Sequence, residues 1–293
     1  MLMLASIVTC ANRPGYNARR IAASLPACTA DIVRSSSSLA PLFVRLGAHL
    51  GSQNDNDPFK NVSLLCHTLY VEPQPQVYER LMRHIADHAN MSALNAAACG
   101  HDTTVEFFTM NIDPATGVGT SVVDGSTHKF STKHSFTSQI ASTSREHVLK
   151  HQKYFAATGV RLSGYIRPIR VPCLSLRTIL QRTDGTLLLL SVDAEGNDAA
   201  ILDAVDWSSV QPHLVVFEQG HLNEEDNRID TGVAWRSPGR RTRSLIAKLR
   251  AHGYLCDAKH DLENAYCVHR RAHGLRGCRP IVDIASSIPE YSD

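Results

Sequence analysis

The sharpest chemical feature of the chain is a pair of acidic side chains and a glycine that follow an apolar run. The run covers residues 186–192 and leads into Asp193-Ala-Glu195-Gly196. Carboxylates at the mouth of a buried strand can position a substrate hydroxyl, accept its proton or hold a divalent cation. In the alternative, structural interpretation, Asp198 begins the next helix and Glu195 only supports the loop. We favour function, because paired acids and a glycine meet there.

A second apolar run, residues 213–217, ends at Glu218-Gln-Gly-His221. In a parallel sheet Glu218 would lie beside Asp193. His221 is a candidate acid or base, because imidazole titrates near neutrality. A lone histidine after a strand is more often a polar loop residue. The candidate catalytic groups are therefore Asp193 and Glu218, with His221 the weakest of the three.

Two glycines and an acid indicate a nucleotide site near the start of the domain. Gly47 and Gly51 follow an apolar run at 42–46, and Glu72 ends another run about 20 residues later, the interval expected for a ribose-binding acid. Its carboxylate would accept hydrogen bonds from both ribose hydroxyls. In the alternative, Glu72 only favours a helix N-terminus. The pattern is not G-x-G-x-x-G, which disfavours a nicotinamide or flavin.

The elements that must position these residues alternate between strands and helices. Such alternation predicts an α/β fold of the doubly wound, Rossmann-like kind, with a mainly parallel sheet and helices on both faces. Ligands bind such sheets beyond the carboxyl ends of the strands. We expect strands at 42–46, 67–71, 93–99, 105–109, 186–192 and 213–217, helices at 76–89, 174–181, 197–205 and 244–252, and a closing hairpin at 254–257 and 265–268.

Three segments are expected along the chain, the second of them with an insertion. Residues 1–40 form an N-terminal extension that is either a targeting segment or disordered, because basic residues and serines outnumber its single acid, Asp31. Residues 41–271 form the main domain. Residues 110–170 are rich in Thr, Ser, Gly and His and are expected to be an insertion or lid, with one helix near 144–157. Residues 272–293 form a C-terminal tail.

Composition limits the class of protein. The net charge of +2 is too small to argue for nucleic acid, and a solvated helix face explains the basic stretch at 236–250 better than RNA binding does. No apolar run approaches the roughly 18 residues of a membrane span. Eight cysteines occur without any C-x-x-C pair, so we expect buried free thiols and, weakly, a reducing compartment. The expected location is the cytoplasm, or an organelle if residues 1–40 are a transit peptide.

Two pairs of histidines have helical spacing. His84 and His88, like His147 and His151, are four residues apart. Two histidines on one helix face can bind a metal, but the sequence offers no third ligand. We therefore expect these histidines to be exposed to solvent, and no metal site is assigned.

The order of these motifs resembles that of the FkbM-type S-adenosylmethionine-dependent methyltransferases. The segment from Gly47 to Gly51 resembles the family's first glycine motif, and Glu72-Pro-Gln-Pro resembles its Glu-Pro-x-Pro segment. Asn95-Ala-Ala-Ala is similar to an Asn-x-Ala segment. The segment that begins at Asp193 is similar to Asp-x-Glu-Gly, and Val-Val-Phe-Glu218 to the closing pattern. The resemblance extends over residues 42–269.

This resemblance implies a seven-stranded class I methyltransferase sheet and S-adenosylmethionine as cofactor. The implied reaction is O-methylation of a hydroxyl group on a small molecule or sugar, with Asp193, Glu218 or His221 as base. A divalent cation held by Asp193 and Glu218 is a less favoured alternative. Glu195 and Gly196 would either contact the substrate or support the residues that contact it. The residues implied at the cofactor are Gly47, Gly51, Glu72, Asn95 and Ala96.

One alternative function belongs to another class. Arg45, His49 and Leu50 differ from residues common at these positions in related methyltransferases. If these differences abolish activity, the chain is a catalytically inactive binding module with the same fold. Cofactor binding without turnover would distinguish it from an enzyme.

Overall fold

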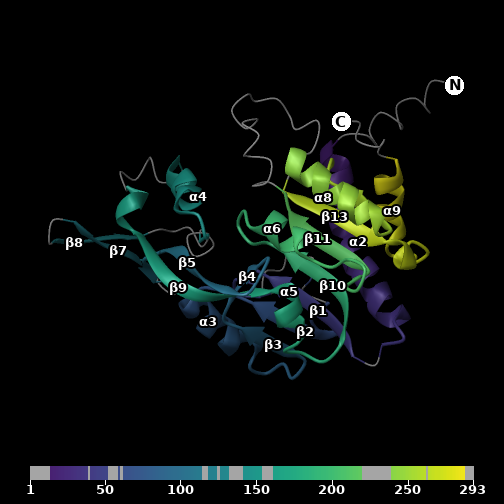
Figure 1. The fold of residues 1–293 in the computed structure, drawn as a ribbon, viewed down its shortest axis with the longest axis horizontal. Helices are drawn as coiled ribbons and strands as arrows, with labels where there is room; N and C mark the ends of the chain where they lie inside the picture. Colours follow the sequence, from purple (N-terminus) through teal and green to yellow (C-terminus); the bar gives the residue numbers. More distant parts are fainter. Residues whose placement is uncertain are drawn as a thin grey trace.

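The computed structural model describes residues 14–38, 40–51, 59, 62–113, 118–123, 126–131, 141–153, 161–219, 239–261 and 263–287, with the backbone alone at 14–19 and 112–131. Strands and helices alternate along most of this length, as the sequence predicts. The fold is a mixed α/β fold built on one large sheet (Figure 1).

The large sheet has seven strands in the order β12-β13-β11-β10-β1-β2-β3. Strand β13 pairs antiparallel with β11 and β12, and the other pairs are parallel. The predictions of a mainly parallel sheet and a closing hairpin are confirmed. The strands are β1 (Pro41–Leu46), β2 (His67–Val71), β3 (Met91–Leu94), β10 (Thr186–Val192), β11 (Leu214–Glu218), β12 (Tyr254–Asp257) and β13 (Asn264–His269).

Apolar side chains project from both faces of this sheet, because successive residues of a strand point to opposite sides. Along β11, Val215 and Phe217 join one buried cluster, whereas Leu214 and Val216 join another. The first cluster is covered by α5 (Leu176–Leu180), α6 (Asp198–Asp203) and α8 (Arg240–Ala251), and the second by α2 (Pro14–Ser35) and α9 (Arg279–Ser286). Helix α3 (Pro75–Ile85) packs on Tyr70 and Ala48.

Helix α2 makes the N-terminal region part of the main core. Ile21 and Leu25 are fully buried in the same cluster as Ile281 of α9, and α2 and α9 lie side by side. The sequence analysis separated both segments from the domain as an extension and a tail. The structure differs, because the apolar residues of α2 and α9 cover one face of the large sheet.

Three disulfides join described cysteines, and they overturn the prediction of free thiols. Cys28 pairs with Cys278, Cys99 with Cys173, and Cys256 with Cys267. Their sequence separations of 250, 74 and 11 follow no common motif. Only strand and helix packing brings the partners together, so spacing could not reveal them. Among the described residues Cys66 is a buried free cysteine. The inference of a reducing compartment loses its basis.

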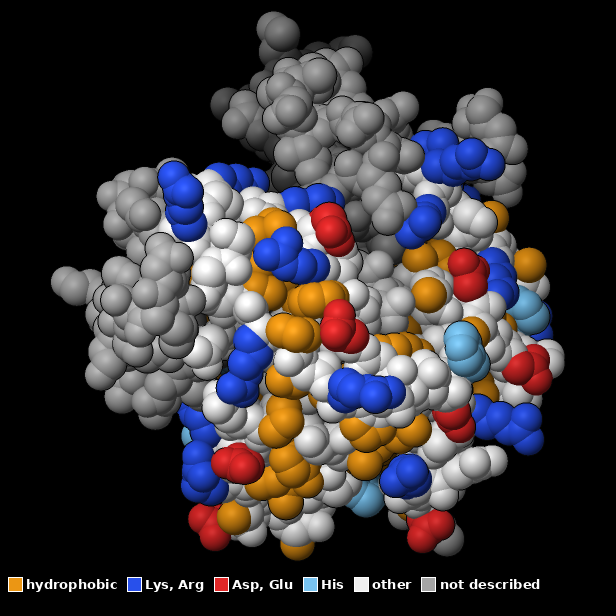
Figure 2. Space-filling view, turned by 60° about the vertical axis from the view of Figure 1, so that its left-hand side comes forward, with side chains coloured by type: hydrophobic (Ala, Val, Ile, Leu, Met, Phe, Trp, Pro, Cys, Tyr) orange, Lys and Arg blue, Asp and Glu red, His pale blue; other side chains and the backbone are white. Residues whose placement is uncertain are grey.

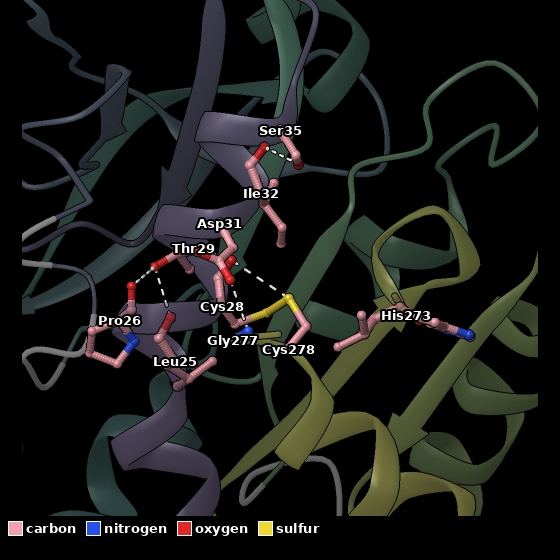
Figure 3. The surroundings of a disulfide bond; sticks show 11 residues. Leu25, Pro26, Cys28, Thr29, Asp31, Ile32, Ser35, His273, Gly277 and Cys278 are labelled. Atoms are coloured by element: carbon pink, nitrogen blue, oxygen red, sulfur yellow. Dashed lines mark hydrogen bonds between the residues drawn. A yellow bond between two sulfur atoms is a disulfide. The ribbon is translucent and has the colours of Figure 1, made fainter. Parts of the chain in front are cut away.

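Figure 3 shows the Cys28–Cys278 bond between α2 and the segment that leads into α9. The backbone N–H of Gly277 donates to Asp31 Oδ2 at 2.9 Å. A Cβ on Gly277 would lie 2.5 Å from the carbonyl carbon and oxygen of Ala27. Only glycine permits this close approach of the two backbones.

The segment expected to be irregular carries two small sheets. In one, β9 (Ile166–Ser175) lies between β4 (Ala97–Cys99) and β5 (Thr103–Met110); the other contains β6 (Ile112–Asp113), β7 (Val118–Val123) and β8 (Ser126–Ser131). Helix α4 (Arg145–Lys150) is shorter than the predicted helix. Strand β9 escaped prediction because it contains Pro168 and Pro172, which disfavour a strand assignment. In Figure 1 these elements extend to one side of the large sheet.

The strand predicted at 93–99 is two strands, β3 and β4, which belong to different sheets. The chain leaves the large sheet at Asn95 and Ala96.

None of the described helices combines the length and apolar character needed to cross a bilayer. On the face shown in Figure 2, Lys and Arg side chains are spread among Asp, Glu and several hydrophobic patches.

Candidate functional site

Four predicted site residues follow the ends of four neighbouring parallel strands. Leu46 of β1 is in register with Val71 of β2 and with Val192 of β10, and Val192 is in register with Phe217 of β11. The next residues along the chain are Gly47, Glu72, Asp193 and Glu218, so all four lie at one edge of the sheet. Because β2 and β10 flank β1 on opposite sides, this edge is a topological switch point, where sheets of this class bind ligands.

The first glycine is required by its contacts. Gly47 has φ of +74°, and a Cβ there would lie 1.6 Å from the carbonyl oxygen of Asp193. The N–H groups of Gly47 and Ala48 both donate to the carbonyl of Val71 at 3.0 Å. The turn after β1 is thereby held against both neighbouring strands. Gly51, with φ of +73°, closes the same turn through its N–H bond to Ala48.

Glu72 contacts this turn through its side chain and is 3% exposed. Its Oε2 accepts a hydrogen bond from the His49 N–H at 2.8 Å, and its Oε1 accepts one from the Gln74 N–H at 2.9 Å. Burial raises the pKa of Glu72 to about 8; the two N–H donors oppose this rise and the charge of Asp193 adds to it. The carboxyl group is therefore fixed between the glycine turn and the start of α3.

Asn95 contacts the backbone of Glu72, and Ala96 follows it along the chain. The Asn95 side-chain amide donates to the carbonyl of Glu72 at 2.9 Å and to that of Pro73 at 3.3 Å. Ala96 is buried, at 1% exposure. These contacts place Asn95 at the same sheet edge as Gly47, and they give it a structural task in holding the Glu72-Pro73 turn.

The turn after β10 carries the acidic residues in unusual backbone conformations. Glu195 has φ of +50° and Gly196 φ of +94°, so two successive residues adopt the left-handed region. Asp193 is exposed, whereas Asp198 is fully buried and accepts hydrogen bonds from the Ala194 N–H at 3.3 and 3.4 Å. Burial, together with the charge of Asp193, raises the pKa of Asp198 to about 7. Asp198 begins α6, as the structural interpretation expected, and its side chain also holds the turn.

Glu218 is half-buried and faces the same carboxylates. Burial, together with the nearby charges of Asp193, Glu195 and Asp198, raises the pKa of Glu218 to about 11. Like charges gathered in a partly desolvated place favour protonation, so this edge retains protons at neutral pH. The position predicted beside Asp193 is supported by the parallel register of β10 and β11. His221 lies outside the described residues.

Sequence analysis missed a group of residues that reach the turn from the inserted segment. Ser142 Oγ donates to the Glu195 carbonyl at 2.9 Å, and His147 Nε2 lies 3.0 Å from Glu195 Oε2. His147 is 6% exposed, so the expectation of an exposed side chain is wrong for it; His84 and His88 are exposed as expected. The only available signal was the spacing of His147 and His151.

His49 is a further residue that the sequence did not assign to a role. Its φ is +49°, and its N–H is the donor to Glu72. Burial lowers the pKa of the imidazole to about 4, assisted by the charges of Arg80 and Arg45. The side chain is therefore neutral at physiological pH and adds no charge beside Glu72.

Comparison with known proteins gives one family and one structure. The model of the Methyltransferase FkbM domain family matches residues 46–256, more than half of the chain. Among solved structures, the crystal structure of methyltransferase FkbM from Methylobacillus flagellatus KT is similar, with a TM-score of 0.41 and 10% identity. The match covers 78% of this chain and 44% of that one, so it spans less than half of the solved protein. No curated protein matches.

Proposed function

The chain belongs to the FkbM methyltransferase family, and on this basis we propose that it transfers a methyl group from S-adenosylmethionine to a hydroxyl group on a small molecule or sugar. The family assignment confirms the resemblance drawn from the motifs. The observation that carries the finer proposal is the alignment of Gly47, Glu72, Asp193 and Glu218 at one sheet edge.

The residues at this edge suit such a cofactor chemically. Glu72 offers carboxyl oxygens to ribose hydroxyls, next to a glycine turn that admits a ligand close to the backbone. The sulfonium and ammonium groups of S-adenosylmethionine are positive, and the carboxylate of Asp193, which is exposed at the strand end, complements them. The residues proposed at the cofactor are Gly47, Gly51 and Glu72, with Asn95 and Ala96 beside them.

S-adenosylmethionine, held by Gly47, Gly51 and Glu72, would supply an activated methyl carbon to the acceptor oxygen and would leave as S-adenosylhomocysteine. The chain must orient the acceptor oxygen and take up its proton. Asp193 is the favoured base, because it is exposed at the strand end. Glu218 has a pKa raised to about 11 and retains its proton at neutral pH, so its suited role is to donate a hydrogen bond to the acceptor. Glu195 and Gly196 shape the turn that carries Asp193.

The test is calorimetric titration of the full chain with S-adenosylmethionine and S-adenosylhomocysteine. We expect micromolar binding by the wild type. Glu72→Gln should weaken it about 10- to 100-fold, because one carboxyl oxygen that can accept from a ribose hydroxyl becomes an amide NH₂ group, which only donates. The matched control is Glu79→Gln, an exposed glutamate on α3 that should leave affinity unchanged. Circular dichroism verifies that each variant is folded.

Equal affinity of wild type and Glu72→Gln would reject the cofactor site. Transfer of a labelled methyl group to a panel of sugars and small hydroxyl compounds then separates the two functions. Turnover supports the enzyme. Cofactor binding without turnover on any acceptor supports the inactive binding module.

A further inference from the structure

Three side chains from two parts of the chain meet beside the turn that follows β10. His147 lies on α4, His151 is the residue that caps the C-terminus of that helix, and Glu195 lies on the turn. One ring nitrogen of each histidine and one carboxylate oxygen all lie within 4.8 Å of one another. His147 Nε2 and Glu195 Oε2 are 3.0 Å apart.

Neighbouring contacts hold these side chains in place. Ser144 caps the N-terminus of α4 by accepting the His147 N–H at 3.2 Å, which orients the helix. Ser142 binds the carbonyl of Glu195 from the same segment. The side chains of His147 and Glu195 are 7% and 24% exposed, so the cluster is shielded from bulk water but remains accessible.

Two imidazoles and one carboxylate form a ligand set that zinc uses in proteins. With ligand bonds of about 2.0–2.1 Å, a tetrahedral ion requires ligand atoms about 3.3 Å apart. His147 and Glu195 already meet this spacing. The spread of up to 4.8 Å requires a modest inward rotation of the outlying side chain. The rings of His147 and His151 have centroids 5.5 Å apart, which is compatible with convergence on one ion.

We propose that His147, His151 and Glu195 bind one Zn²⁺ ion. In the sequence the two histidines at helical spacing had no third ligand. Glu195, 48 residues beyond His147, supplies it in the structure. The ion would join the inserted segment to the turn that carries Asp193. Three protein ligands leave a fourth position for water or for an oxygen of a bound molecule.

The proposal stands independently of methyl transfer. It requires only these three side chains, and it does not involve Glu72 or the glycine turn. Loss of zinc binding and loss of S-adenosylmethionine binding are therefore separate results. In the alternative, His147 and Glu195 only form a hydrogen-bonded pair.

The test titrates Zn²⁺ into the chelator-treated full chain by calorimetry. We expect one ion per chain. Loss of residues that merely orient ligands costs 10–100-fold in affinity, so His151→Ala and Glu195→Gln should each weaken binding by about 100-fold or more. The matched control is His84→Ala, which removes an exposed histidine that also has a histidine four residues away. It should leave affinity unchanged.

A second readout guards against misfolded variants. Zn²⁺ should raise the melting temperature of the wild type and of His84→Ala, but not of His151→Ala, because an ion that binds only the folded state stabilises it. Co²⁺ in the same site should give the visible absorption of a four-coordinate ion. Folded wild-type protein that binds no zinc, or binds it as tightly after His151→Ala, would overturn the proposal.

Discussion

At the scale of single residues, backbone conformation decides more of the site than side-chain chemistry does. Gly47 is defined by a contact that a Cβ would make with the Asp193 carbonyl, and Glu72 by the two N–H groups that hold its carboxyl oxygens. His49 and Glu195 adopt left-handed conformations without being glycine. Such conformations cost of order 1–3 kcal/mol each and cluster at functional sites. The site is therefore a strained edge held by its neighbours.

Replacing Gly47 by alanine should strongly destabilise the protein. The new methyl group would overlap the backbone carbonyl of Asp193, and alanine would have to adopt a disfavoured φ, so we expect a loss of several kcal/mol in the free energy of unfolding. The control is Gly274→Ala, where a Cβ meets nothing within 4 Å. Denaturant unfolding followed by circular dichroism measures both. Equal stability of the two variants would contradict the close approach seen at Gly47.

At the scale of elements, helices α2 and α9 cover one face of the large sheet, and disulfides fasten distant elements to each other. Helix α2 brings an apolar face to the sheet, and Cys278 fastens the C-terminal segment to it. Cys99 and Cys173 join β4 to β9, which are neighbouring strands of the small sheet β4-β9-β5. The disulfides thus connect elements that are distant in sequence, which limits how the chain ends and the insertion can move.

Removing the Cys28–Cys278 bond should cost more stability than removing Cys256–Cys267. A cross-link between distant residues restricts the unfolded chain more, and its loss should cost about 5 kcal/mol for the separation of 250 against about 3 kcal/mol for that of 11. Paired Cys→Ser variants at each bond test this by thermal and denaturant unfolding. A larger loss for the short loop would contradict the expected order.

At the scale of the whole molecule, the acidic sheet edge links protonation to folding. The pKa of Glu72 is raised to about 8, that of Asp198 to about 7 and that of Glu218 to about 11. Each of these groups binds a proton more tightly in the folded state than in the unfolded state. The stability that they contribute is present at acid pH and is lost as pH rises through the folded pKa.

The melting temperature should therefore fall between about pH 6.5 and pH 8. Histidines with lowered pKa, such as His49 and His269 at about 4, act in the opposite direction only below about pH 6.5, so this window isolates the carboxyl groups. Glu218→Gln should flatten the fall, because it removes one group and relieves the repulsion on its neighbours. Glu79→Gln should preserve it. A melting temperature that rises across the window would contradict the prediction.

Much of the fold follows from local patterns in the sequence. Apolar runs predicted β1, β2, β10 and β11 within a residue or two, because buried parallel strands need continuous apolar stretches. The acids after those runs predicted Glu72, Asp193 and Glu218 at one edge, because the carboxyl ends of parallel strands coincide. The glycine positions carried their own signal through the conformations that only glycine adopts readily.

Tertiary structure alone decided the disulfides, the burial of α2 and the meeting of His147 with Glu195. The cysteine partners and the histidine cluster join segments with no shared motif, and contacts between distant segments leave no periodic trace in the sequence. Helix α2 contains three arginines against one acidic residue and runs into a stretch of serines, and this composition masks its apolar face. By itself the sequence determined which residues end the strands, since that depends on neighbours along the chain. The packing of distant segments determined what surrounds those residues.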